Sequence, residues 1–211
     1  MNTLGSLEAR EQFLQMAVRM AQIKIPDDLA AGEKQRTIEA LNNLFLAARK
    51  DVVESYPSYK EDVRMLSIYG LFYNGIGDPA SGEKVLTEAH AIAPSKQLLT
   101  FELIRSLLLE KKYEEAYTIG KDTYDLSITC NDALKWYMVS AAYNGKYKEA
   151  KAYALTKGQD LGIDPDVIGG IVASGQTQVA IDILEDTKRK NPALAPQIDA
   201  FIKQLLLAPR R

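Results

Sequence analysis

The sequence contains one cysteine and one histidine, and this scarcity excludes several classes of site. Cys130 alone cannot form a disulfide within the chain. Protein zinc sites take most of their ligands from Cys and His side chains, and Cys130 and His90 are too few for one. A Cys–His catalytic pair would need these same two residues. We instead expect Cys130 to be a small buried residue or to lie near a turn, and His90 to do no chemistry. We therefore predict no metal, no cofactor and no catalytic residue.

An excess of positive charge is also missing. The chain has 26 Lys and Arg residues against 28 Asp and Glu residues, a net charge of −2. Nucleic-acid binding requires a basic face. The short basic runs at 188–190 and 210–211 are typical of solvated ends. We predict no nucleic-acid partner.

Long apolar runs are absent as well. No run of 18 apolar residues occurs, so we predict no membrane span in this chain. The first ten residues lack the apolar core of an export signal. The expectation is a soluble chain, cytoplasmic by default, or tethered to a membrane if it is part of a larger protein. Its 211 residues, 46% of them hydrophobic, suffice for a sizeable core.

The chain does contain an internal repeat. The sequence Tyr-Glu-Glu-Ala at 113–116 recurs as Tyr-Lys-Glu-Ala at 147–150, a step of 34 residues. One further step back from Ala116 leads to Gly82. A fixed period of this size indicates stacked structural repeats.

The clearest repeat unit reads as two antiparallel helices. Residues at helical spacing on one face of the first helix are Leu66, Tyr69, Gly70 and Tyr73. The segment 77–79 then breaks the helix, because Asp78 is a good N-cap and Pro79 suits a first helical position. The second helix places Gly82, Leu86 and Ala89 on one face, and Pro94 closes it.

These positions resemble the tetratricopeptide repeat (TPR), whose fixed offsets take large, apolar, small, aromatic, small, aromatic, small and proline residues. All eight positions match in size class: Leu66, Tyr69, Gly70, Tyr73, Gly82, Leu86, Ala89 and Pro94. The small residues would allow close helix packing, and the aromatic ones would fill the space between helices. The resemblance implies an all-α fold, a right-handed α-solenoid of antiparallel helix pairs.

Four repeat units are predicted, at about 63–96, 97–130, 131–160 and 161–193, within a solenoid region spanning 61–211. The second unit departs from the pattern at Ile104, Gly120 and Thr123, and the third departs at Met138. Because Ala150 and Ala180 are only 30 residues apart, we expect the third connection to be one helical turn short. A C-terminal capping helix is expected from Pro196 to Leu207. Residues 1–60 are predicted to form an N-terminal helical hairpin that stacks on the first repeat, with its second helix ending near Pro57.

The glycines at 77 and 82, with Lys84 nearby, raise the alternative of a phosphate-binding loop. Such a loop follows a strand and places Lys and then Ser or Thr directly after its second glycine. Here Glu83 occupies the lysine position and Val85 follows Lys84, and the preceding segment reads as a helix. We interpret the glycines as parts of a bend between helices.

In TPR stacks the first helix of each unit lines a concave groove. From their positions within each repeat unit, the predicted groove residues are Arg64, Leu71, Asn74, Phe101, Arg105, Leu108, Lys135, Val139 and Tyr143. Ser67, Leu98 and Ala142 also fall at lining offsets. The expected partner is a protein or peptide, anchored by Phe101 and Tyr143, whose acidic group meets the cations. Equally, these residues could be covered by the N-terminal helices or by a second subunit, so self-association is possible.

A second resemblance concerns the whole chain. The N-terminal segment Glu-Ala-Arg-Glu-Gln-Phe-Leu at 8–14 and the link Ala-Pro-Ser-Lys-Gln at 93–97 are similar to the soluble C-terminal TPR tails of some bacterial O-antigen ligase or polymerase membrane proteins. In that family the chemistry belongs to the membrane part. The predicted function is therefore a non-catalytic TPR scaffold for protein–protein interaction, with such a tail as the alternative.

Overall fold

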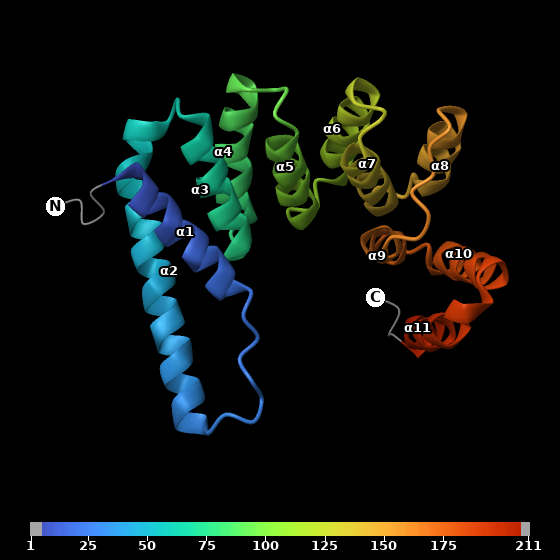
Figure 1. Cartoon of the computed structure of the whole chain (residues 1–211), viewed down its shortest axis with the longest axis horizontal. Helices are drawn as coiled ribbons and strands as arrows, with labels where there is room; N and C mark the ends of the chain where they lie inside the picture. Colours follow the sequence, from blue (N-terminus) through green and yellow to red (C-terminus); the bar gives the residue numbers. More distant parts are fainter. Residues whose placement is uncertain (1–5, 208–211) are drawn as a thin grey trace. The chain divides into compact units, whose positions relative to one another are not determined.

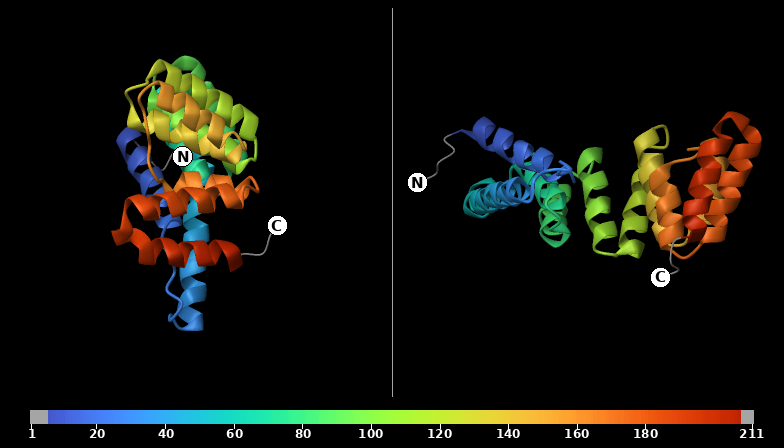
Figure 2. Two further views of the ribbon diagram at one scale, coloured as in Figure 1. Left: turned by 90° about the vertical axis from the view of Figure 1, so that its right-hand side faces the viewer. Right: turned by 90° about the horizontal axis from the view of Figure 1, so that it is seen from below.

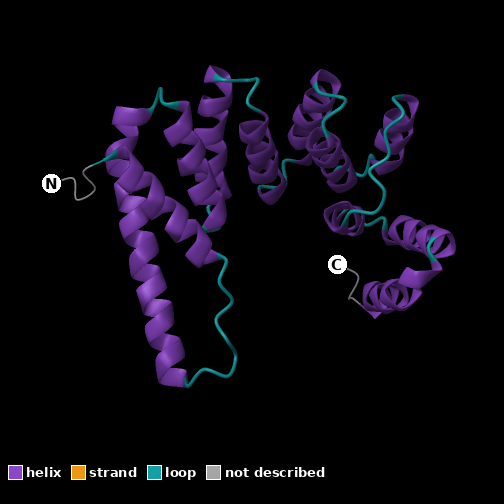
Figure 3. Ribbon diagram, in the orientation of Figure 1, coloured by secondary structure: helices purple, strands orange, loops and turns teal. Residues whose placement is uncertain are grey.

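The computed structural model describes residues 6–207, which form eleven α-helices and one short 3₁₀ helix and contain no strand (Figure 1, Figure 3). The predicted all-α class is confirmed. The helices are α1 (Leu7–Ala21), α2 (Ala31–Tyr59), α3 (Val63–Gly75), α4 (Pro79–Ile92), α5 (Gln97–Leu109), α6 (Tyr113–Leu126), α7 (Asn131–Tyr143), α8 (Tyr147–Thr156), α9 (Pro165–Ala173), α10 (Thr177–Lys190) and α11 (Ala195–Leu207), with the 3₁₀ helix η1 (Pro192–Leu194) before α11.

The chain divides into two compact units, one up to Lys111 and one from Lys112 onward. Unit 1 holds α1 to α5, and unit 2 holds α6 to α11. The sequence-based boundary at residue 60 separates the hairpin from the repeats and stays a prediction. In unit 1 the hairpin helix α1 packs on the first repeat helix, α3, and belongs to the same unit.

The first three helix pairs repeat in register. Their first helices begin at Val63, Gln97 and Asn131 and have 13 residues each. Their second helices begin at Pro79, Tyr113 and Tyr147, so each pair repeats after 34 residues. The fourth pair departs because α9 has only 9 residues, about one turn fewer than the other first helices. The missing turn therefore lies in α9. The prediction that it lies in the third connection is wrong, because residues 157–164 form a longer link than 93–96 or 127–130.

The turn between the two helices of each pair contains one residue in the left-handed region. These residues are Gly77 (φ 79°), Lys111 (φ 60°), Gly145 (φ 73°) and Gly175 (φ 81°). Glycine adopts this conformation without a steric penalty, whereas a residue with a Cβ does not. Lys111 is the only described non-glycine residue with positive φ. The turn geometry is thus repeated even where the sequence does not supply glycine.

The pair α3–α4 packs closely through its glycines. A Cβ on Gly70 would lie 2.3 Å from Cγ of the fully buried Leu86, and one on Gly82 would lie 2.6 Å from Oδ1 of Asn74. The Asp78 carboxylate caps α4 by accepting from the Ser81 backbone N–H at 3.3 Å. It also pairs with Arg49 at 2.8 Å. The interpretation of this stretch as a bend between helices agrees with these contacts.

In unit 1, α1 crosses the C-terminal half of α2 (Figure 1, Figure 2). The crossing contains a buried ion pair, in which Nε of Arg10 lies 2.7 Å from Oδ2 of Asp51. Arg10 is 3% exposed. Ser55 of the same half of α2 shares a hydrogen bond of 2.7 Å with the Tyr69 hydroxyl of α3. Pro57 lies inside α2, which ends at Tyr59.

Unit 2 has an aromatic core between α6, α7 and α8. The rings of Tyr124 and Tyr137 stack at 5.2 Å, and Tyr153 meets both edge-on at 6.3 Å. Burial is the largest of the causes that raise the pKa of Tyr137, and a hydrogen bond with Tyr117 adds to it. After this core α9 packs on α7, and α10 continues through η1 to α11. The C-terminal helix expected from Pro196 to Leu207 is observed one residue longer, as α11.

Candidate binding surface

The predicted groove residues of α3 differ in accessibility. The Arg64 side chain is 57% exposed and pairs with Glu11 of α1. Leu71 is half-buried. Asn74 is 4% exposed, so a ligand does not reach its side chain in this conformation.

Asn74 instead joins α3 to α5. Its Nδ2 donates to the Glu102 carbonyl oxygen at 3.2 Å and to Glu102 Oε2 at 3.3 Å. Its Oδ1 accepts from the Ser106 hydroxyl at 2.8 Å. The close approach of Gly82 completes this buried polar cluster. The role of Asn74 is therefore to position two first helices relative to one another.

Among the predicted lining residues of α5, the accessible ones are Leu98, Arg105 and Leu108. Leu98 is 62% exposed, whereas Phe101, the expected anchor, is 8% exposed. Leu108 is half-buried. The Arg105 side chain is 43% exposed and lies 3.7 Å from the Glu102 carboxylate. Leu98 is better placed than Phe101 to contact a partner.

The predicted groove residues of unit 2 are held by their neighbours. Lys135 of α7 lies 2.8 Å from Asp166 and 3.2 Å from Asp164, at the start of α9. The hydrogen bond with Asp166, followed by that with Asp164, raises the Lys135 pKa against the opposing effect of burial. Val139 is 3% exposed. The Tyr143 ring stacks on Tyr113 at 5.7 Å, and burial raises the pKa of Tyr143.

Each predicted groove cation thus has a carboxylate partner within its own unit. Glu102 precedes Arg105 by three residues, a helical spacing that the sequence shows. Glu11, Asp164 and Asp166 come from other helices, and only the fold brings them to Arg64 and Lys135. An acidic ligand would have to replace these carboxylates.

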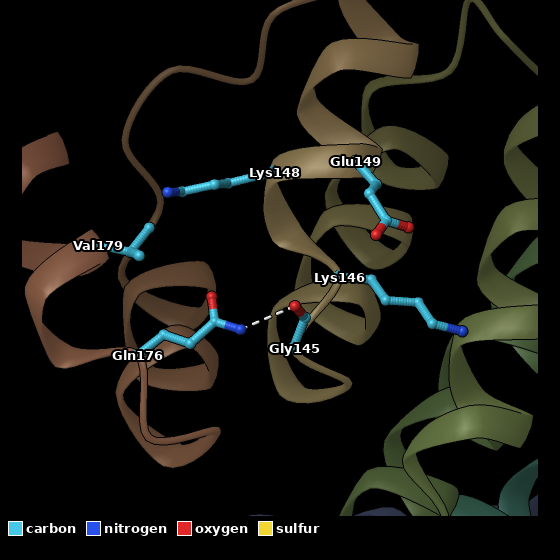
Figure 4. Close-up of a pocket in the computed structure, with 6 residues that line it drawn as sticks. All are labelled: Gly145, Lys146, Lys148, Glu149, Gln176 and Val179. Atoms are coloured by element: carbon cyan, nitrogen blue, oxygen red, sulfur yellow. Dashed lines mark hydrogen bonds between the residues drawn. The ribbon is translucent and has the colours of Figure 1, made fainter.

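Unit 2 also contains a surface hollow between the α7–α8 turn and the start of α10 (Figure 4). Its lining residues are Gly145, Lys146, Lys148, Glu149, Gln176 and Val179. Gln176 Nε2 donates to the Gly145 carbonyl at 2.8 Å and so ties the two turns together. Figure 4 shows Lys148 extending toward Val179, while Lys146 points away, toward its partner Glu114. The sequence alone does not reveal this hollow, because its sides come from two repeats.

Within residues 6–207, no three His, Cys, Asp or Glu side chains gather as a metal site would require. In the same range no helix is both long and apolar enough to cross a membrane. His90 contacts the Thr100 hydroxyl at 3.2 Å through Nδ1. Cys130 is half-buried at the N-cap of α7, near a turn.

Comparison with protein-family models, with curated proteins and with solved structures gives no significant match.

Proposed function

We propose that this protein is a non-catalytic scaffold of TPR-like helix pairs, stacked as a right-handed solenoid, that binds a protein or peptide partner. The observation that carries the proposal is the repetition of helix starts at 63, 97 and 131 and at 79, 113 and 147. Helix pairs that recur in register favour stacking, and stacked pairs present their first helices as one extended surface.

The proposed partner is a peptide segment with apolar and acidic side chains. Leu71, Leu98 and Leu108 are at least partly accessible, and Arg64 and Arg105 lie on the same two helices. The partners Glu11 and Glu102 are only 17% and 14% exposed, but Arg105 lies 3.7 Å from Glu102, which is beyond hydrogen-bond distance. A ligand carboxylate can therefore bind the Arg105 guanidinium without breaking a hydrogen bond to Glu102.

Selection of a random peptide library against the full chain tests this proposal. We expect enrichment of peptides that combine leucine-like and acidic residues. The double variant Leu98→Ala/Arg105→Glu should weaken their binding at least about tenfold, since both an apolar contact and a charge-assisted hydrogen bond are lost. The control Leu126→Ala/Lys84→Glu makes the same kinds of change at exposed sites on second helices. Absence of enriched peptides, or equal binding by the two double variants, would contradict the proposal.

A further inference from the structure

The N-cap residues of α4 and α8 make equivalent contacts with an earlier helix. Lys146, the N-cap of α8, follows Asp78, the N-cap of α4, by 68 residues, which is two periods of 34. Lys146 Nζ donates to Glu114 Oε1 of α6 at 2.9 Å, across 32 residues. Arg49 Nη2 of α2 donates to Asp78 Oδ2 at 2.8 Å, across 29 residues. The C-terminal half of α2 therefore contacts α4 as α6 contacts α8.

A second pair of contacts agrees with this equivalence. The Tyr153 hydroxyl of α8 donates to Asp125 Oδ1 of α6 at 2.7 Å, across 28 residues. The Tyr56 hydroxyl of α2 donates to the Glu88 carboxylate of α4, across 32 residues. These contacts indicate that α1 and the C-terminal half of α2 form a further helix pair, placed before α3 and α4. The intervening residues 22–47 are then an insertion within that pair.

The first helix of this pair, α1, packs beside α3, as α3 packs beside α5 (Figure 1). Glu11, in the second turn of α1, pairs with Arg64 at the start of α3. Near the other end of α3, a Cβ on Gly75 would lie 3.2 Å from Cγ1 of Val18. The two helices therefore run in the same direction, and the last turn of α1 is level with the last turn of α3.

Helix α5 reaches the same level. The Ser106 hydroxyl of α5 donates to Oδ1 of Asn74, in the last turn of α3, at 2.8 Å. Arg105 directly precedes Ser106, and Leu71 lies about one turn before Asn74. On α3, Asn74 faces α5 and Gly75 faces α1. Leu71 falls between these two sides of the helix, because successive residues are rotated by about 100°. Leu71 therefore points toward the surface between α1 and α5.

Arg19 completes a row of three side chains at this level. Ala17 is fully buried, and Val18 lies against α3. Arg19 points about 200° from Ala17, away from the buried side of α1, and is exposed. Within residues 6–207, no ion pair includes Arg19. The one carboxylate on the same exposed side, that of Glu8, begins about 16 Å away along the helix. Arg19 is thus available to a carboxylate from a partner.

We infer that the peptide-binding surface proposed above begins at α1, and that Arg19 and Arg105 bind two acidic residues of an extended peptide on either side of Leu71. The inference rests on the proposed function. Packed helices lie about 8–10 Å apart, so the two steps from α1 to α5 span roughly 16–20 Å. An extended chain advances about 3.3 Å per residue, which places the two acidic residues about five or six positions apart. A helical peptide would need a row of apolar anchor sites, whereas the surface between the two arginines offers the half-buried Leu71.

The peptides enriched by the selection described above are the probe. We expect them to carry two acidic residues about five or six positions apart, with an apolar residue between them. Titration of the full chain by fluorescence anisotropy should show binding weakened at least about tenfold in Arg19→Glu and in Arg105→Glu, since each loses a charge-assisted hydrogen bond. The control Arg36→Glu reverses another exposed arginine of unit 1, on the N-terminal half of α2, and should leave binding unchanged. Circular dichroism checks that each variant is folded.

Charge exchange tests which peptide residue meets Arg19. Replacing one acidic residue of the peptide by lysine should restore binding to Arg19→Glu, and replacing the other should restore binding to Arg105→Glu. Peptides that lose affinity for Leu98→Ala/Arg105→Glu but bind Arg19→Glu as tightly as wild type would overturn this inference and leave the proposed function intact. Failure of both lysine peptides to recover binding to Arg19→Glu would also overturn it. A selection that enriches no peptide removes the proposed function and this inference together.

Discussion

The first helix α3 and the second helix α4 of unit 1 are each about one turn longer than the first helix α9 and the second helix α8 of unit 2. The former pair has helices of 13 and 14 residues, and α4 packs on both α3 and α5. In unit 2, α8 has 10 residues and α9 has 9, and α9 packs on α7. The link 157–164 takes the place of the last turn of α8. The difference indicates that a second helix packs on the next first helix where it keeps its last turn, as α4 and α6 do with 14 residues each.

The largest expected effect is on the tight packing of α3 with α4. Gly70→Val would place a branched side chain against Leu86, which is fully buried and cannot move aside. We expect a loss of about 3 kcal/mol in the free energy of unfolding, measured by chemical denaturation. A loss below about 0.5 kcal/mol would mean that this pair is not closely packed.

Adjacent glycines of α9 provide a matched pair in unit 2. A Cβ on Gly170 would lie 2.9 Å from Ala142 Cβ and 2.8 Å from the Tyr143 ring, whereas one on Gly169 meets nothing within 4 Å. Gly170→Ala should cost about 1–2 kcal/mol of unfolding free energy. Gly169→Ala should gain up to about 1 kcal/mol from helix propensity. Equal signs for the two variants would contradict close packing of α9 on α7.

The turns allow a reciprocal exchange. Lys111 has a left-handed backbone conformation, which is sterically unfavourable for a residue with a Cβ. Lys111→Gly removes the Cβ and should raise the free energy of unfolding by about 0.5–1 kcal/mol. Gly145→Lys, at the equivalent position one period later, should lower it by about 1 kcal/mol or more. Thermal or chemical denaturation of both variants checks the prediction. A stabilising Gly145→Lys would contradict the equivalence of the turns.

The smallest effect concerns the long link after α8. Asp160 accepts from Lys151 and from the Gly162 backbone N–H, and these contacts lower the pKa of the Asp160 carboxyl. The pKa of Asp160 in the folded state lies below its value in the unfolded state, so its contacts stabilise the fold at any pH above the unfolded pKa. This stabilisation is lost below about pH 4, as the pH falls through the folded-state pKa. Asp160→Asn should remove this acid-dependent contribution, which solvent screening limits to less than about 0.5 kcal/mol. Unfolding free energies of both chains between about pH 2 and 6 measure it. An unchanged slope would show that the link is not held by Asp160.

Local sequence features predicted the helices well and the contacts of the candidate surface poorly. Asp78 and Asp164, each followed by proline, mark the starts of α4 and α9, and both carboxylates accept from backbone N–H groups. Caps and helical periodicity depend on neighbouring residues, so the sequence shows them. The burial of Asn74 and Val139 and the pairing of Arg64 with Glu11 depend on other helices, so offsets within one repeat do not reveal them. The resemblance to O-antigen ligase tails, which rests on residues 8–14 and 93–97, stays a prediction because no comparison matches it.

The central claim, that in-register helix pairs stack as one solenoid, is tested most directly by distances between spin labels at Lys84, Thr118 and Ala152. These exposed residues lie one period apart on α4, α6 and α8. In a Cys130→Ser background, regular stacking predicts narrow distributions with the same mean for the pairs 84–118 and 118–152. A broad 84–118 distribution, or a mean clearly different from that of 118–152, would contradict the solenoid.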